Sequence, residues 1–137
     1  MLVYAHREEL PGHGAYRDWL TAAVNGEAAY GMSELVLAGF VRVVTNPRVF
    51  DGPTPLETAL AATEILRAQP NCVLVSPGPA HWDIFTRLCL SAAVKGNLVA
   101  DAYLAALAIE SGAEWITTDR DFSRFPGLRW RHPLARR

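Results

Sequence analysis

The run from Asn97 to Gly112 constrains the fold of this chain most strongly. Alanine and leucine dominate it, and both residues favour helices. Gly112 stands where a helix commonly ends in the left-handed conformation. We therefore predict a helix over residues 97–112. Asp101 is expected in its first turn, where the helix dipole favours a carboxylate.

Asp101 has an apolar setting on this predicted helix. Leu104, Ala105 and Ala108 follow it by three, four and seven residues and share its face. A carboxylate that lies along such a row needs a partner or a metal ion. The simpler interpretation is that Asp101 only favours the start of a helix.

An apolar run and an acidic turn follow this helix. Residues 113–117 predict a strand, and Asp119 and Asp121 come directly after it. Helix, tight turn, strand and acidic strand end form one αβ unit that can bring three carboxylates together. Taken singly, Asp119 and Asp121 have the simpler interpretation of capping the turn that follows.

Strand and helix patterns alternate along the rest of the chain. Strands are predicted at residues 1–5, 28–32, 71–76 and 128–131, and helices at 13–25, 34–44, 54–68 and 80–94. Ser33 is the expected N-cap of the helix at 34–44, and residues 54–57 match a capping box. The alternation predicts an α/β fold. We expect a single domain over residues 1–137, with a parallel β-sheet flanked by helices on both faces.

Composition narrows the functional class. The 137 residues carry a net charge of −1, which argues against a protein that coats nucleic acid non-specifically. From Arg120 to the end of the sequence there are six arginines and only one acidic residue, so a basic C-terminal surface is available to bind phosphates. No apolar run approaches the roughly 20 residues of a membrane span, and no signal peptide is evident, which indicates a cytoplasmic protein. The histidine and cysteine spacing favours neither a zinc site nor a thiol nucleophile.

Four acids stand out by their position. Glu34 and Asp101 lie early in helices, whereas Asp119 and Asp121 follow a strand. Helix starts and strand ends converge in parallel α/β folds, although no spacing rule forces these four together. Carboxylates about 4 Å apart repel by roughly 4 kcal/mol at an effective dielectric of about 20, so such a cluster favours a hard divalent cation. Such an ion can activate water and neutralise a phosphodiester, and Thr117 can add a hydroxyl.

Five motifs in order carry a family resemblance. They are residues 2–5, 33–35, 45–50, 97–102 and 117–122. Together they resemble a PIN-domain protein of the VapC toxin type over nearly the whole chain. The resemblance implies a PIN fold and a Mg²⁺- or Mn²⁺-dependent endoribonuclease that hydrolyses RNA phosphodiesters. It also implies a homodimer and a VapB-type antitoxin as partner, with no membrane association.

The resemblance also assigns site residues. By motif position, Glu34, Asp101 and Asp119 match the acids that hold the metal ion in the family. Asp121 matches a further acid found in many members, and we expect it to bind the ion or to orient water. Thr117 is the expected supporting hydroxyl. The residues expected to contact RNA phosphates are Arg7, Arg120 and Arg124.

The N-terminal motif departs from the family pattern. The family's first strand opens with an Asp in an Asp-x-Asn setting, whereas this sequence begins at Met1 with the apolar run under way. We therefore expect an N-terminal strand truncated before the family Asp. This leaves open an alternative function, a catalytically impaired PIN-domain module that still dimerises and binds an antitoxin. A metal-dependent phosphatase on another acid-rich α/β fold is weaker, because it requires an Asp nucleophile after the first strand.

Overall fold

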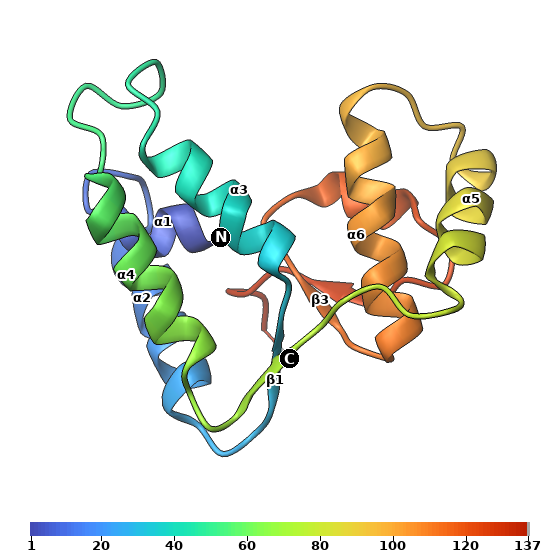
Figure 1. Cartoon of the computed structure of the whole chain (residues 1–137), viewed down its shortest axis with the longest axis horizontal. Coiled ribbons are helices and arrows are strands. Elements are labelled where there is room, and N and C mark those ends of the chain that lie inside the picture. Colours follow the sequence, from blue (N-terminus) through green and yellow to red (C-terminus); the bar gives the residue numbers. More distant parts are fainter. Residues whose placement is uncertain (137) are drawn as a thin grey trace. The chain divides into compact units, whose positions relative to one another are not determined.

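The computed structural model describes residues 1–136 (Figure 1). The chain divides into two compact units, the first spanning Met1–Val75 and the second beginning at Ser76. Each unit has its own hydrophobic core and its own pair of parallel strands.

The first unit packs helices around one short parallel strand pair. Its elements are α1 (Leu2–His6), α2 (His13–Asn25), β1 (Tyr30–Met32), α3 (Glu34–Val44), α4 (Leu56–Arg67) and β2 (Cys72–Leu74). Tyr30 pairs with Cys72 and Met32 with Leu74. The core residues Leu37, Phe40 and Val44 recur at helical spacing on α3, so one face of this helix is buried.

The N-terminus of α3 is capped as predicted. The hydroxyl of Ser33 accepts a hydrogen bond from the backbone N–H of Leu35 at 3.2 Å. This bond satisfies one of the donors that a helix start leaves without an intrahelical partner. The cap fixes Glu34 as the first residue of α3, the helix that follows β1.

The strand predicted at residues 1–5 is wrong, because Leu2–His6 forms the helix α1. A short apolar run does not by itself distinguish a buried strand from a buried helix. Leu2 and Ala5, three residues apart, are both buried, which is the spacing of one helical face. The carbonyl of Tyr4 accepts a hydrogen bond from Nδ1 of His13 at 2.9 Å, which ties α1 to α2. Residues 1–5 therefore do not supply the family's first strand.

The capping box predicted at residues 54–57 is also wrong. The helix α4 begins at Leu56 with Pro55 as its N-cap, and no side chain caps it. Thr54 is buried, and its Oγ1 lies 3.1 Å from Nε2 of His6 and 3.3 Å from Nη1 of Arg7. The hydroxyl that the local pattern assigned to the helix start is used for tertiary contacts instead.

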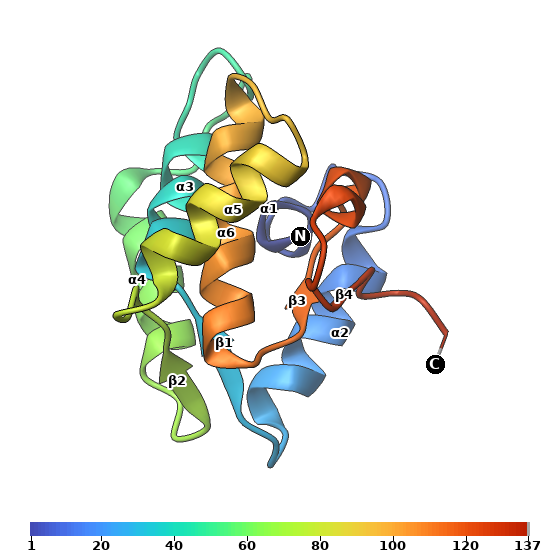
Figure 2. The same cartoon turned by 90° about the vertical axis from the view of Figure 1, so that its right-hand side faces the viewer.

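The second unit packs two helices side by side (Figure 2). Its elements are α5 (His81–Ser91), α6 (Asn97–Ser111), β3 (Trp115–Ile116), the 3₁₀ helix η1 (Arg120–Arg124) and β4 (Trp130–Arg131). The strands β3 and β4 pair in parallel, with Trp115 opposite Trp130. The core contains Leu88 of α5, the fully buried alanines of α6, and two phenylalanines of the η1 region.

The helix expected over residues 97–112 forms almost as predicted, as α6. It ends at Ser111, and Gly112 follows in the left-handed conformation with φ of 72°. The α/β class and the parallel strand pairing are confirmed as well. Within residues 1–136 the strands form two separate pairs, one in each unit, and no helix is long and apolar enough to cross a membrane.

Candidate functional site

Asp101 projects from α6 beside the small residues that form the core of the second unit. It lies in the second turn of the helix and not in the first as predicted, because α6 begins at Asn97. Its neighbours Ala102 and Ala105 are fully buried, and Asp101 itself is half-buried. The apolar row expected beside this carboxylate is therefore present, with Ala108 buried on the same face.

The environment of Asp101 disfavours its charged form. Burial raises the pKa of the Asp101 carboxyl, and the nearby carboxylates of Asp119 and Asp121 raise it further. The guanidinium of Arg124 acts in the opposite direction. The three aspartates are thus within electrostatic range of one another, as the αβ segment predicted, and we call them the aspartate cluster.

Asp119 begins the turn that carries the rest of the cluster. Its Oδ1 accepts a hydrogen bond from the backbone N–H of Asp121 at 2.9 Å, and Thr117 Oγ1 accepts one from the N–H of Asp119 at 3.1 Å. The simple capping interpretation of Asp119 is therefore confirmed. This bond uses one acceptor position on one oxygen, so the carboxylate keeps lone pairs for a further ligand. Thr117 shapes the turn through its hydroxyl.

Two arginines flank the aspartate cluster. Arg124 places Nη2 at 3.5 Å from Oδ1 of Asp121, and its Nε donates to the Asp121 carbonyl at 3.2 Å. Arg124 therefore offsets part of the negative charge of the cluster. Arg120 is exposed between the two acids of the turn.

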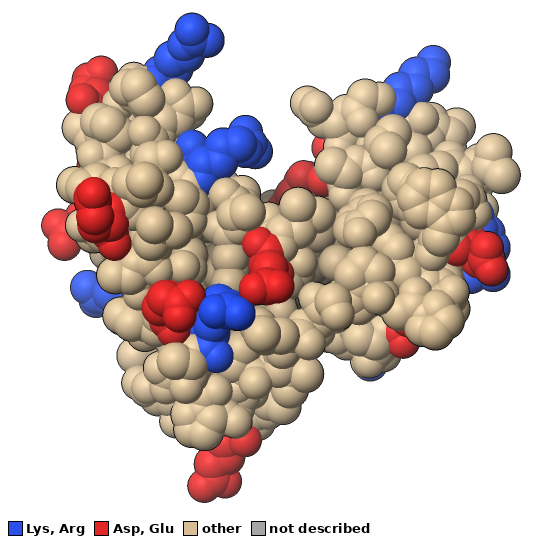
Figure 3. All heavy atoms as spheres, in the orientation of Figure 1, with Lys and Arg blue, Asp and Glu red and all other residues tan. Residues whose placement is uncertain are grey.

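Acidic and basic side chains are interspersed on the face drawn in Figure 3.

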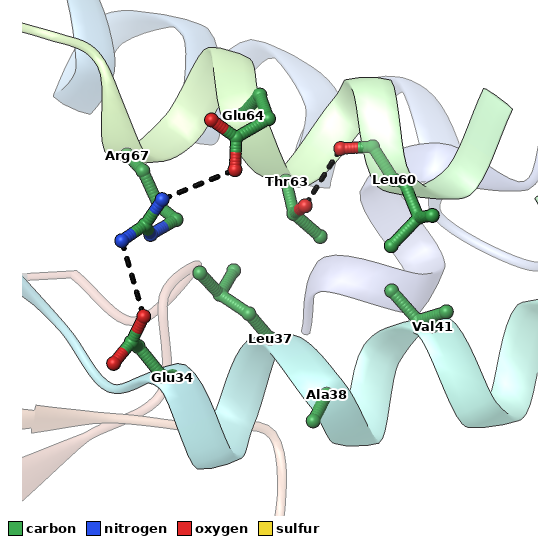
Figure 4. A pocket seen from close by; sticks show the side chains of 8 residues that line it. All are labelled: Glu34, Leu37, Ala38, Val41, Leu60, Thr63, Glu64 and Arg67. Carbon is green, nitrogen blue, oxygen red and sulfur yellow. Dashed lines mark hydrogen bonds and ion pairs between the residues drawn. The ribbon is translucent and has the colours of Figure 1, made fainter. Parts of the chain in front are cut away.

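Glu34 belongs to the first unit, where it is the first residue of α3. Its Oε2 lies 3.1 Å from Nη2 of Arg67, the last residue of α4, and Nη1 of Arg67 lies 3.1 Å from Oε1 of Glu64 (Figure 4). These side chains stand at one end of a groove of about 190 Å³ between α3 and α4.

Sequence reasoning missed Arg67. Its i,i+3 relation to Glu64 was visible in the sequence, since residues three apart share a helix face. Its contact with Glu34 spans 33 residues, and no local pattern indicates such a contact.

Arg7 is engaged within the first unit. Its side chain is 14% exposed, and it pairs with Glu9. Its Nη1 donates to the carbonyl of Gly52 at 2.7 Å, and the guanidinium lies 4.2 Å from the ring centre of Phe50. In this structure Arg7 ties the end of α1 to the loop before α4. The RNA contact predicted for Arg7 stays a prediction.

The donor chemistry of these acids fits a hard divalent cation. Mg²⁺ and Mn²⁺ prefer oxygen ligands, and the carboxylates of Asp119 and Asp121 add to burial in raising the pKa of Asp101. Within the described residues 1–136, however, no group of three or more His, Cys, Asp or Glu side chains is arranged to hold an ion. The acids thus offer oxygen donors of the right kind, but the described residues do not gather three of them around one point.

Comparisons with known proteins define the family. A model of the PIN domain matches residues 1–128, so the chain belongs to the PIN-domain family, as the five motifs predicted. Ribonuclease VapC43 of Mycobacterium tuberculosis H37Rv is 47% identical over 134 residues, which cover 98% of this chain and 91% of the relative. Ribonuclease VapC25 of the same strain is 37% identical over 133 residues, covering 97% and 94%.

A solved structure shows the same fold. The crystal structure of VapBC2 from Rickettsia felis, bound to a DNA fragment from the promoter, matches with a TM-score of 0.65. The match covers 95% of this chain and 91% of that chain at 19% identity, which supports the fold alone.

Proposed function

We propose that this chain is a Mg²⁺- or Mn²⁺-dependent endoribonuclease toxin of a VapBC-type toxin–antitoxin system. The observation that carries the proposal is the aspartate cluster, in which burial and two neighbouring acids raise the pKa of Asp101. Perturbed carboxylates of this kind are typical of functional sites. The 47% identity to a protein named Ribonuclease VapC43 gives the cluster its chemical context.

The proposed roles follow the chemistry of each side chain. Asp101 and Asp119 would hold a metal ion through carboxylate oxygens, and Asp121 would bind the ion or orient the attacking water. The role of Glu34 as a ligand is proposed from the family resemblance alone. When bound, such an ion activates water and neutralises charge on a phosphodiester. Arg124 limits repulsion among the acids by its position beside Asp121. Arg120 is exposed next to the cluster, where its charge is available to an RNA phosphate.

The proposed partners are RNA, a VapB-type antitoxin and a second copy of the chain. Support for the antitoxin comes from the VapBC2 complex, whose toxin fold this chain shares. Apolar side chains on α4 support coverage by another protein chain, because Leu56, Leu60 and Ile65 are 53%, 48% and 61% exposed.

The experiment that tests the activity is cleavage of a mixed RNA pool by the chain, with Mn²⁺ and with a chelator. We expect Mn²⁺-dependent cutting that falls about 100-fold or more in Asp101→Asn, because removing a central electrostatic group commonly costs this much. Asp18→Asn is the matched control, since Asp18 is an exposed acid that pairs with Arg17. Cutting that persists in the chelator, or an unchanged rate in Asp101→Asn, would contradict the proposal.

A second candidate is a catalytically impaired PIN-domain module that still dimerises and binds an antitoxin. The observation that favours it is the lack of a completed three-ligand group within residues 1–136. The same assay separates the two candidates. A folded chain that binds a VapB-type antitoxin and cuts no RNA with Mn²⁺ supports the module.

A further inference from the structure

We propose that His6, Arg7 and Thr54 form an acid-sensitive latch, which holds the loop between α3 and α4 against the end of α1 and loosens when His6 gains a proton. All three residues lie in the first unit, where His6 ends α1 and Thr54 stands just before α4. The inference needs neither a metal ion nor RNA, so it stands or falls independently of the proposed function.

The hydroxyl of Thr54 is the centre of the latch. Thr54 is buried, and its Oγ1 lies 3.1 Å from Nε2 of His6 and accepts a hydrogen bond from Nη1 of Arg7 at 3.3 Å. The backbone N–H of Thr54 donates to the carbonyl of Val44, the last residue of α3, at 2.8 Å. One buried residue therefore connects the ends of α1 and α3 just before α4 begins.

The loop is shaped to meet Arg7. Nη1 of Arg7 also donates to the carbonyl of Gly52 at 2.7 Å, and the guanidinium lies 4.2 Å from the ring centre of Phe50. Phe50 is buried, and its N–H donates to the carbonyl of Asn46 at 3.1 Å. Residues 45–50, one of the five motifs of the sequence, thus place an aromatic ring under a cation. The latch gives this motif a role that the proposed reaction does not use.

The direction of these hydrogen bonds depends on the protonation of His6. A hydroxyl has one hydrogen to donate and two lone pairs, whereas the guanidinium of Arg7 can only donate. With Nε2 of His6 unprotonated, Thr54 accepts from Arg7 and donates its own hydrogen to the imidazole. A proton on Nε2 turns the imidazole into a second donor, so the hydroxyl hydrogen loses its acceptor and two positive charges meet at one oxygen. Protonation of His6 therefore weakens the contact with the loop.

Charged groups around His6 act mainly in the same direction. Burial lowers the pKa of His6, and the charge of Arg7 lowers it further. The acids Glu8 and Glu9 line the same pocket as His6, and Glu9 raises the pKa of His6. His13 of α2 lowers it. The neutral imidazole, which the latch requires, is thus the favoured form in the folded chain.

The remaining neighbour of His6 is apolar. Phe40 of α3 stands edge-on to the imidazole, with the ring centres 5.2 Å apart, and it offers no hydration to a charged ring. Because the pKa of His6 is lowered in the folded chain, the unfolded chain takes up the proton first. The contribution of His6 to stability is therefore complete above about pH 6.5 and is lost as pH falls through the lowered pKa.

The test is an NMR titration of the full chain between about pH 8 and about pH 5, which brackets the ordinary histidine pKa. We expect the imidazole of His6 to titrate below about pH 6.5, and the backbone amides of Phe50, Gly52 and Thr54 to shift with the same midpoint. Hydrogen exchange of the Thr54 amide, corrected for its intrinsic pH dependence, should be about fivefold or more faster at the acid end. This factor is the one expected for the loss of one hydrogen bond.

Four variants separate the latch from a pH-insensitive contact. His6→Gln keeps an acceptor for the Thr54 hydroxyl but gains no proton, so the loop amides should stop responding to pH. Thr54→Val removes the hydroxyl, so it should raise the pKa of His6 towards its ordinary value and uncouple the amides. Thr54→Ser keeps the hydroxyl and should retain the coupling. The matched control is His132→Gln, which removes a histidine of the second unit and should leave the response intact.

Three results contradict the latch: loop amides that do not respond to pH, a response whose midpoint differs from that of His6, and a response that survives in His6→Gln. A folded Thr54→Val that keeps the full coupling contradicts it as well. Circular dichroism confirms folding of each variant. If Thr54→Val does not fold, His6→Gln and Thr54→Ser decide the matter, because both keep a hydrogen bond at this position.

Discussion

At the scale of single residues, the aspartate cluster works against the stability of the protein. Asp101 is half-buried beside fully buried alanines, and the charges of Asp119 and Asp121 add to burial in raising its pKa. An uncharged side chain of the same shape would avoid both the desolvation and the repulsion. Residues that lower stability in this way are typical of functional sites.

The unfavourable charge on Asp101 leads to a prediction about how stability depends on pH. Because the pKa of Asp101 is raised in the native chain, the unfolded chain ionises first, and stability falls as pH rises from about 4 through the raised pKa. Asp101→Asn should therefore melt higher than the native chain at pH 7, by on the order of a few degrees. The difference should vanish below about pH 4, where both states are protonated. Melting curves across this range test it, and equal melting temperatures at pH 7 would contradict it.

At the scale of elements, Glu110 near the end of α6 anchors the segment that leads into α5. Its Oε1 accepts a hydrogen bond from the N–H of Gly78 at 2.7 Å, and its Oε2 accepts one from the N–H of Ala80 at 2.9 Å. A Cβ at position 78 would lie 2.8 Å from Oε2 of Glu110. The glycine is therefore required by the approach of the carboxylate.

We predict that Gly78→Ala and Glu110→Ala are not additive. Each should lower the free energy of unfolding by about 1 kcal/mol, since each removes the same pair of charge-assisted hydrogen bonds. In the Glu110→Ala background the added methyl group meets no carboxylate. There Gly78→Ala should be neutral, or stabilising by about 0.5 kcal/mol through the unfolded chain. Urea unfolding of the native chain, the two single variants and the double variant measures the coupling. Additive changes in the free energy of unfolding would show that Gly78 and Glu110 do not interact.

Local patterns predicted some elements well and others poorly. The sequence from Asn97 to Gly112 predicted α6 to within a residue at its end, because composition and the terminal glycine agree. Residues 2–6 are too few to show a period, so the burial of Leu2 and Ala5 decided the helix. Thr54 matched the sequence pattern of a helix cap, but its hydroxyl instead contacts His6 and Arg7, which are far away in the sequence.

At the scale of the whole molecule, the same contrast separates the candidate residues of the second unit from those of the first. The aspartate cluster lies within one αβ segment, so its members were predictable from their order along the chain. The pairing of Glu34 with Arg67 depends on how α3 packs against α4, which sequence spacing does not determine. Because the net charge is −1, the RNA binding proposed above would depend on local arginines and on a bound cation.

A bound cation should therefore stabilise the whole chain. An ion that binds the folded state alone adds about 2.7 kcal/mol to the free energy of unfolding when its concentration is 100 times its Kd. We predict that Mn²⁺ raises the melting temperature of the native chain and that a chelator reverses the rise. The rise should be much smaller in Asp101→Asn and unchanged in the control Asp18→Asn, because only Asp101 belongs to the aspartate cluster. A melting temperature that does not respond to Mn²⁺ would show that these acids bind no ion in the folded chain, and the raised pKa of Asp101 would then reflect burial and repulsion alone.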